Sequence, residues 1–131
     1  LRGGTLTYNG WDGDGKQVRD VLHVDDLADL VVMQVARMDD LDGETFNVGG
    51  GLGCSLYLQE TTALCRVITG REIPITPVLE TLQADVKLYV TDNSRVTAAT
   101  GWVPRRSAEQ VLRDLHDWMA AHGDQLRTAG L

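Results

Sequence analysis

Cysteine, proline and long apolar runs are scarce in this sequence. Its 131 residues include 2 Cys and 3 Pro, and no apolar run reaches the ~20 residues that span a bilayer, so we expect no membrane partner. Basic residues number 12 and acidic residues 19, and the net charge of −7 argues against a nucleic-acid partner because no basic patch offsets it. Cys54 and Cys65 match no zinc or redox spacing, which predicts reduced thiols in a cytoplasmic protein.

What is present is the composition of a folded domain. Apolar residues make up 43% and charged residues 24% of the chain, which excludes a disordered tail. The length suits one domain. The chain begins with Leu1 rather than Met, and no apolar core of a signal peptide follows Arg2. We therefore expect the chain to be one portion of a longer cytoplasmic molecule.

Apolar periodicity predicts a mixed α/β chain of about four helices and about five short strands. The first helix is expected to have its N-cap at the acids of positions 25 and 26, and the second at Ser55. The second helix is expected to end at Gly70 and the third at Gly101. A capping box at residues 107–110 opens the last helix. Strands are expected at residues 5–8, 18–24, 44–48, 72–78 and 87–90.

Residues 49–53 form a glycine-rich loop between a predicted strand and a predicted helix, which is the position of a dinucleotide-binding loop. Glu72 follows at about the 20-residue spacing expected of an acid that binds ribose. The pattern departs from G-x-G-x-x-G because position 54 is Cys, and Glu72 precedes its strand instead of following one. We therefore favour a surface turn over a cofactor site.

Histidines and acids form no catalytic or metal-binding cluster in the sequence. His116 and His122 are six positions apart and do not share a helix face, and His23 lies in a short predicted strand. The acids Asp12 and Asp14 lack the later Glu of a calcium loop. We therefore predict no catalytic residue and no metal site.

Residues 13–20 (GDGKQVRD) carry a more informative pattern. The glycines leave backbone N–H groups accessible, and Lys16 and Arg19 add positive charge. The guanidinium of Arg19 suits bidentate hydrogen bonding to phosphate. An exposed ion pair between Arg19 and Asp20 is the alternative interpretation. Three aromatic residues could stack on a base or fill the core equally well: Tyr8, Trp11 and Tyr89.

Five segments occur in a recognisable order: residues 6–10 (LTYNG), 15–26 (GKQVRDVLHVDD), 46–50 (FNVGG), 89–92 (YVTD) and 101–104 (GWVP). As an ordered set they resemble the C-terminal part of nucleotide-sugar epimerases and dehydratases, which are extended short-chain dehydrogenase/reductase enzymes. The sequence of residues 16–23 (KQVRDVLH) is similar to the CDP-sugar 2-epimerase branch of that family, and so is the loop that holds Trp11.

The resemblance implies a substrate-binding portion without its catalytic half. Enzymes of this family have an N-terminal Rossmann domain that binds NAD and carries a catalytic Tyr-x-x-x-Lys pair, and a smaller C-terminal region that binds the nucleotide sugar. Neither that pair nor a G-x-x-G-x-x-G loop occurs in this sequence. The expected fold class is therefore α/β, with residues 1–131 as the nucleotide-sugar-binding region. NAD would be bound by the Rossmann domain that this chain lacks, and no cofactor by the chain itself.

The resemblance carries ligand contacts over to five positions. Arg19 matches the arginine that contacts the substrate diphosphate, and Gln17 matches a neighbouring position on the nucleotide side. Tyr8 belongs to the segment that lies along the base, and Asp85 matches the acid associated with the ribose. Lys87 stands where the family often has an arginine, and it supplies charge without a planar fork.

One departure leaves the substrate open. Leu82 occupies a position that is usually arginine in the family, which removes a donor to the diphosphate. The resemblance therefore implies a nucleoside-diphosphate sugar as partner, without deciding the base, the sugar, the carbon, or epimerase against dehydratase.

A stand-alone, non-catalytic binding or self-association module is the alternative. The helix predicted to follow Asp26 is apolar nearly all round and expects partners on more than one side. Without a Rossmann domain against it, this apolar surface would be exposed and would favour association between copies. We therefore expect a homo-oligomer or a domain-swapped dimer.

Overall fold

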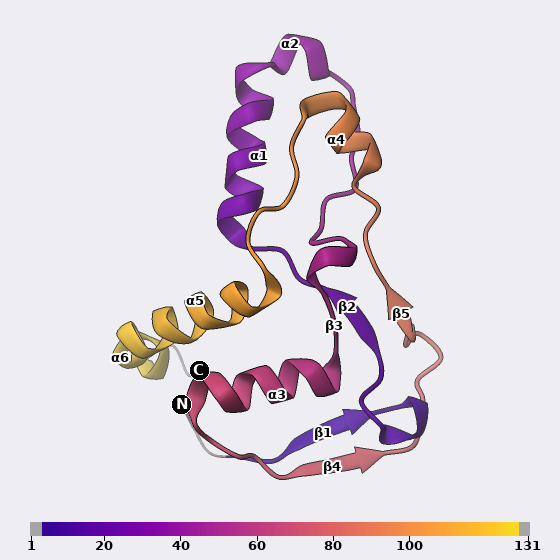
Figure 1. The fold of residues 1–131 in the computed structure, drawn as a ribbon, viewed down its shortest axis with the longest axis vertical. Coiled ribbons are helices and arrows are strands. Elements are labelled where there is room, and N and C mark those ends of the chain that lie inside the picture. The colour runs from indigo at the N-terminus through magenta and orange to yellow at the C-terminus, as the bar shows by residue number, and fades with distance from the viewer. Residues whose placement is uncertain (1–3, 129–131) are drawn as a thin grey trace. The chain divides into compact units, whose positions relative to one another are not determined.

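The computed structural model describes residues 4–128. Its elements are drawn in Figure 1 and follow the chain in this order: β1 (Leu6–Asn9), the 3-10 turn η1 (Trp11–Gly13), β2 (Val18–Asp20), α1 (Val24–Ala36), α2 (Met38–Leu41), the 3-10 turn η2 (Leu52–Cys54), β3 (Ser55–Tyr57), α3 (Leu58–Thr69), β4 (Ile75–Val78), β5 (Leu88–Tyr89), α4 (Ser94–Thr100), α5 (Ala108–Ala121) and α6 (Gly123–Thr128). The predicted α/β class with short strands is confirmed, with six helices in the described residues instead of about four.

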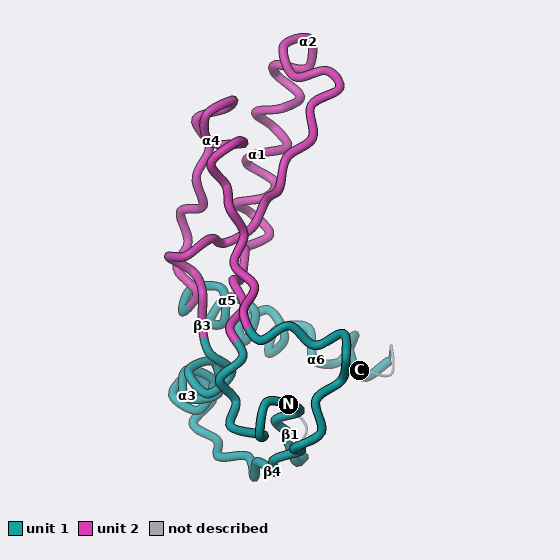
Figure 2. The backbone as a smooth tube through the Cα atoms, turned by 90° about the vertical axis from the view of Figure 1, so that its right-hand side faces the viewer, with its two compact units in different colours: residues 1–17, 57–87, 109–131 teal, residues 18–56, 88–108 magenta. Residues whose placement is uncertain are grey.

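The chain divides into two compact units, each assembled from separate stretches of sequence (Figure 2). Unit 1 comprises residues 1–17, 57–87 and 109–131, and unit 2 comprises residues 18–56 and 88–108. Each unit contains its own small sheet and its own packed side chains.

Unit 1 contains a two-stranded parallel sheet made of β1 and β4. Tyr8 is in register with Pro77, which lacks a backbone N–H and therefore suits an edge strand. The helix α3 begins where the side chain of Glu60 accepts a hydrogen bond of 2.7 Å from the N–H of Tyr57. It ends at Gly70, whose φ of +66° confirms the predicted C-terminal glycine.

Unit 2 contains the sheet β3–β2–β5, in which β2 and β5 run parallel. Its apolar core consists of Leu30, Val96 and Trp102. The indole N–H of Trp102 donates to the carbonyl of Asp26 at 2.9 Å, so the core aromatic is also tied to the first turn of α1. This bond satisfies a donor that would otherwise be buried without a partner.

The expected strand at residues 44–48 is wrong. This segment has no ladder partner in the described residues, and Phe46 and Val48 instead pack against the unit 2 core from an irregular stretch of chain. β-Branched and aromatic residues favour any half-buried surface, not a strand alone. Apolar character therefore predicted their burial without predicting their backbone.

Two predicted helix caps are also wrong. His23 caps α1, because its Nδ1 accepts a hydrogen bond of 3.1 Å from the N–H of Asp25. Asp26, expected as a cap, is 1% exposed and has partners elsewhere in unit 2. Ser55 lies in β3, and its hydroxyl donates to the carbonyl of Leu52 at 2.8 Å, so it does not cap α3.

Candidate functional site

Tyr8 is a buried residue of β1, with 8% of its surface exposed. Its hydroxyl donates to Oγ1 of Thr62 at 2.8 Å. Gly15 packs against the ring so closely that a Cβ there would lie 2.6 Å from ring carbons. The Tyr8 side chain thus fills the interior of unit 1, and its contact with a nucleotide base stays a prediction.

Gln17 is 9% exposed and its carboxamide is held in one orientation. Its Nε2 donates to the carbonyl of Asn9 at 2.5 Å, while its Oε1 is buried and has no hydrogen-bond partner among residues 4–128. The amide cannot exchange its two ends without losing the bond to Asn9. The group of this side chain that has no partner is therefore an acceptor, and it is buried.

Asp85 and Lys87 approach the chain immediately after β1. The carboxylate oxygen Oδ2 of Asp85 lies so near Gly10 that a Cβ there would be 3.0 Å away. The ammonium of Lys87 lies 5.2 Å from the centroid of the Trp11 ring.

Three of the five ligand contacts predicted from the sequence therefore meet three consecutive residues of unit 1. Gln17 bonds to residue 9, Asp85 approaches residue 10 and Lys87 lies over residue 11. They come from positions as far apart as 17 and 87 in the sequence, so their convergence is a property of the fold.

Arg19 belongs to unit 2 and lies on β2 in register with Tyr89 of β5. The residue is exposed, and its Nη1 donates to the carbonyl of Val18 at 2.7 Å. Tyr89 is 56% exposed, which does not support the core role considered for it. The assignment of Arg19 to a substrate diphosphate stays a prediction.

The first three residues of the glycine-rich loop at residues 49–53 pack inside unit 2. The N–H of Gly49 donates to Oδ1 of Asn93 at 3.1 Å, and the N–H of Gly51 donates to Oδ2 of Asp20 at 2.8 Å. A Cβ on Gly50 would lie 1.9 Å from the carbonyl of Val21, so the backbone there has no room for a side chain. The expected surface location therefore holds for Leu52 and Gly53, which are exposed, and is wrong for Gly49, Gly50 and Gly51, which are buried.

The same contacts decide whether this loop fits a dinucleotide. A phosphate-binding loop offers free backbone N–H groups and positive potential to the pyrophosphate. Here two of those N–H groups are already taken, one of them by the carboxylate of Asp20. Burial alone would raise the pKa of Asp20, but hydrogen bonds from Gly51 and Thr91 outweigh it and lower the pKa, which keeps the group anionic. An anion stands where a pyrophosphate would have to be, so the loop does not fit NAD.

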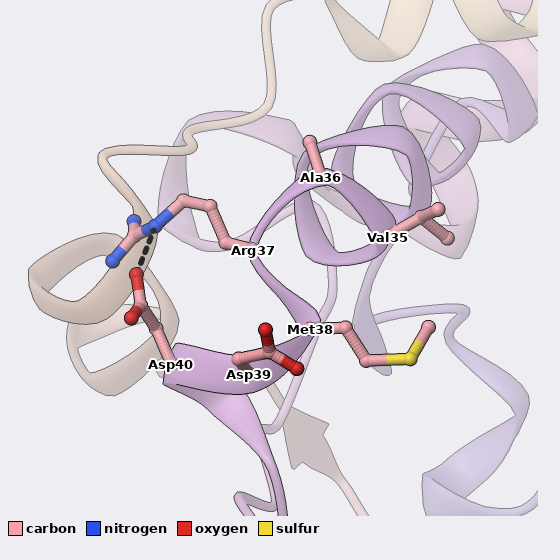
Figure 3. Close-up of a pocket in the computed structure, with 6 residues that line it drawn as sticks. All are labelled: Val35, Ala36, Arg37, Met38, Asp39 and Asp40. Carbon is pink, nitrogen blue, oxygen red and sulfur yellow. Dashed lines mark hydrogen bonds and ion pairs between the residues drawn. The ribbon is translucent and has the colours of Figure 1, made fainter.

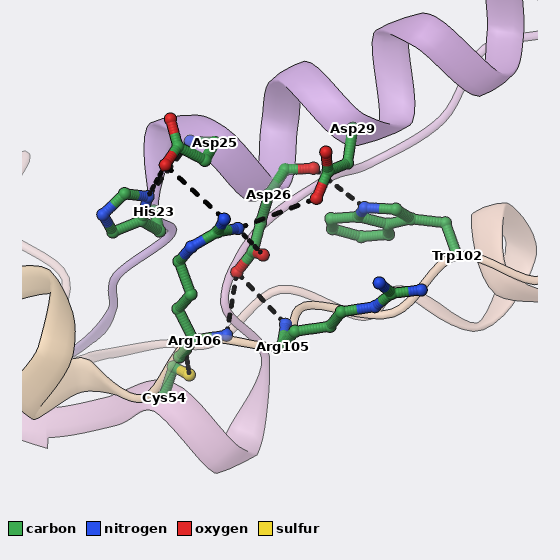
Figure 4. A network of polar contacts seen from close by, with 8 residues as sticks. All are labelled: His23, Asp25, Asp26, Asp29, Cys54, Trp102, Arg105 and Arg106. Atoms are coloured by element: carbon green, nitrogen blue, oxygen red, sulfur yellow. Dashed lines mark hydrogen bonds and ion pairs between the residues drawn. The ribbon is translucent and has the colours of Figure 1, made fainter.

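A polar network around Asp26 holds unit 2 together (Figure 4). Oδ2 of Asp26 accepts hydrogen bonds of 3.1 Å from the backbone N–H groups of Arg105 and Arg106, and Oδ1 accepts one of 2.6 Å from Nη1 of Arg106. The Arg106 guanidinium also lies 3.5 Å from Asp25 and 3.7 Å from Asp29. This cluster ties the start of α1 to the segment before α5.

The two thiols are poorly suited to nucleophilic chemistry. Cys54 is buried, Cys65 is half-buried, and both are free cysteines. Burial raises the pKa of both thiols, so the reactive thiolate is disfavoured. Sγ of Cys54 instead donates to the carbonyl of Arg106 at 3.2 Å.

A pocket of about 360 Å³ opens beside the junction of α1 and α2 in unit 2 (Figure 3). It is lined by residues 35–40, and the side chains of Arg37 and Asp40 meet across it at 3.4 Å. Arg37 also donates to the carbonyl of Ala99 at 2.9 Å. None of the five predicted ligand contacts lines this pocket.

Two further features are absent from residues 4–128. No group of three or more His, Cys, Asp or Glu side chains in this range could hold a metal ion. No helix in this range is both long enough and apolar enough to cross a bilayer.

Comparison with known proteins finds similarity to one family of enzymes. Residues 2–49 match the sequence model of the NAD dependent epimerase/dehydratase family. The chain is 33% identical over 109 residues to the CDP-paratose 2-epimerase of Salmonella typhi, covering 83% of this chain and 32% of that protein. It is 30% identical over 108 residues to the UDP-glucose 4-epimerase of Rhizobium leguminosarum bv. trifolii, covering 82% of this chain and 32% of that protein.

Solved structures agree with the sequence relatives. A UDP-glucose 4-epimerase from Stenotrophomonas maltophila with bound NAD and formylated UDP-arabinopyranose superposes with a TM-score of 0.74 at 24% identity, over 92% of this chain and 35% of that one. A UDP-glucose 4-epimerase from Thermotoga maritima with UDP-glucose superposes with a TM-score of 0.62 at 29% identity, over 80% of this chain and 32% of that one.

These matches confirm the resemblance to NAD-dependent nucleotide-sugar epimerases and dehydratases. The chain has the fold of one portion of such an enzyme. It spans about a third of the length of the curated relatives it matches.

Proposed function

We propose that this chain is the nucleotide-sugar-binding portion of an NAD-dependent nucleotide-sugar epimerase, and that the parent enzyme is a CDP-sugar 2-epimerase. The observation that carries the proposal is the convergence of Gln17, Asp85 and Lys87 on residues 9–11 of unit 1. Similarity to a CDP-paratose 2-epimerase over most of the chain supports the choice of CDP.

The proposed roles follow from the chemistry of each side chain. Arg19 and Lys87 offer cationic donors to a diphosphate, and Asp85 offers a carboxylate to ribose hydroxyls. Gln17 offers an acceptor on the nucleotide side, and Tyr8 supports the strand that lies along the base. No residue of this chain is assigned to the chemical step.

NAD is proposed to bind to a Rossmann portion of the parent enzyme outside residues 1–131. The loop at residues 49–53 supports this division, because two of its N–H groups are occupied and Asp20 adds negative charge there. When bound, NAD would supply the hydride acceptor for epimerisation, and this chain would hold the sugar nucleotide. Two free cysteines support the further proposal of a reducing, cytoplasmic setting.

Titration of the isotopically labelled chain with CDP, UDP and NAD, followed by NMR, tests the proposal. We expect CDP to shift signals of unit 1 with a roughly millimolar dissociation constant, which corresponds to a favourable binding free energy of only about 4 kcal/mol. We expect NAD to shift none. Tighter binding of NAD than of CDP would contradict the proposed function, whereas tighter binding of UDP than of CDP would contradict the CDP assignment alone.

Self-association is a second candidate function, favoured by the exposed apolar face of α1. Leu27 is 41% exposed, Val31 48% and Val35 60%, and their spacing places them along one side of the helix. We expect sedimentation velocity to show a homodimer or a domain-swapped pair at high concentration. Val31→Glu is expected to restore a monomer, because a charge would be buried in the contact. A wild-type monomer at every concentration contradicts this candidate.

A further inference from the structure

The turn that follows β1 has a left-handed backbone at two residues that are not glycine. Trp11 has a φ of +50° and Asp12 a φ of +65°, between Gly10 at +73° and Gly13 at +66°. A bulky residue in this region is strained, because its Cβ crowds the backbone. Such strain persists where the surrounding structure enforces it, and it is concentrated where a side chain must be aimed.

Three hydrogen bonds hold this turn. The N–H of Gly10 donates to the carbonyl of Val78 at 2.7 Å, and the N–H of Trp11 donates to Oγ1 of Thr81 at 2.8 Å. The N–H of Gly13 closes the turn on the carbonyl of Gly10 at 2.9 Å. The turn is thus tied to the end of β4 and to the segment that leads towards Lys87.

The indole of Trp11 faces the Lys87 ammonium, whose Nζ lies 5.2 Å from the ring centroid. A ring face attracts an ammonium without occupying its N–H donors, which stay available to an anion. The indole Nε1 is buried and has no hydrogen-bond partner among residues 4–128. Among residues 4–128, the indole of Trp11 therefore interacts with Lys87 through its ring face and not through its N–H.

One carboxylate within electrostatic reach of Lys87 is already engaged. The carboxylate of Asp14 forms an ion pair of 2.8 Å with Lys16. Its hydrogen bond with Lys16 lowers the pKa of Asp14, and the charge of Lys87 lowers it further, so Lys87 lies within electrostatic reach. Lys87 is held near this carboxylate while its direct contact is with the ring.

We infer that Trp11 is a positioning residue that holds the Lys87 ammonium for the diphosphate of the bound nucleotide. The inference rests on the proposed function. A lysine has a flexible stem and lacks the planar fork of an arginine, so it loses more freedom when it grips a phosphate. The ring of Trp11 restricts that freedom before the ligand arrives, and the left-handed turn keeps the ring in place.

Four variants of the 131-residue chain test this inference by NMR titration with CDP and with cytidine, which lacks the diphosphate. Trp11→Leu is expected to weaken CDP binding about two- to fivefold, the range of an exposed cation–π contact. Trp11→Phe is expected to lose less, because it keeps an aromatic face. Lys87→Met is expected to weaken CDP binding at least as much, and adding Trp11→Leu to it should cost nothing more. Cytidine binding should be unchanged throughout.

Trp118→Leu is the matched control, because Trp118 is 51% exposed and stacks on His122 in the same unit. It is expected to leave CDP binding unchanged. Equal losses for CDP and cytidine in Trp11→Leu, or additive losses in the double variant, would overturn the inference and leave Trp11 a structural residue. A wild-type chain that binds neither CDP nor cytidine would contradict the proposed function, and this inference with it.

Discussion

Asp26→Asn is expected to lower the free energy of unfolding by about 3–5 kcal/mol, the usual cost of breaking a buried ion pair. The carboxylate is 1% exposed and accepts three hydrogen bonds from Arg105 and Arg106. An amide has the same shape, but its NH2 group would face another donor. Arg106 would also lose the partner that compensates its partly buried charge.

Urea denaturation followed by far-ultraviolet circular dichroism measures this loss, because the helix α1 carries Asp26. Asp25→Asn is the matched control. Asp25 has a side chain that is 61% exposed and lies 3.5 Å from the same guanidinium. Exposed pairs contribute little, so we expect it to cost no more than about 1 kcal/mol. Equal losses in the two variants would show that burial of Asp26 is not the cause.

The pH dependence of the Asp26 contribution follows from its environment. Burial alone would raise the pKa of Asp26, but hydrogen bonds from Arg106 and Arg105 outweigh it, so the pKa in the folded state is lowered. The contribution is therefore present above the unfolded pKa of about 3.9 and is lost as the pH falls through the folded value. The difference in stability between the wild type and Asp26→Asn should shrink below about pH 4.

Arg19→Ala is expected to weaken binding of CDP by about 1.5–3 kcal/mol, the range for a hydrogen bond to a charged group. The proposed function assigns this guanidinium to the diphosphate, so cytidine binding should change little. Arg19→Lys is expected to recover part of the loss, because it restores the charge without the planar fork. Calorimetric or NMR titration of the 131-residue chain gives the affinities.

Arg95→Ala is the control for this variant. Arg95 is also an exposed arginine of unit 2, and it forms an ion pair of 2.5 Å with Glu44. Its loss should not affect CDP binding. Unchanged binding in Arg19→Ala would mean that Arg19 is a surface residue, which is the alternative interpretation of its sequence pattern.

Local signals in the sequence predicted the elements whose stability is local. The glycines that end α3 and α4 were predicted correctly, because a left-handed residue at a helix end favours glycine wherever it occurs. The role of Asp26 could not be predicted. Its partners lie some 80 positions away, and nothing in its own neighbourhood distinguishes a buried acceptor from a helix cap.

Some features of the candidate site could likewise be predicted from the sequence, and others could not. Resemblance identified Gln17, Asp85 and Lys87, and the fold brings them to residues 9–11. The sequence could not reveal that Tyr8 points inward, because alternate residues of a strand face opposite sides and either side can carry an aromatic residue. Trp11 was expected from the sequence to be a base-stacking or core residue. Its left-handed backbone could not be predicted, because it depends on contacts with β4 and Thr81.

The interleaving of the two units constrains how the chain is made and how it folds. The chain crosses from one unit to the other after Gln17, Leu56, Lys87 and Ala108, so neither unit is one continuous piece of sequence. On the ribosome, β1 emerges before β4, and its ladder cannot close until β4 has been synthesised. Pairing across so long an intervening loop is slow, and β1 is exposed to competing partners meanwhile. Cutting the chain at any single crossing would therefore damage both units at once, and truncation is a poor way to isolate either of them.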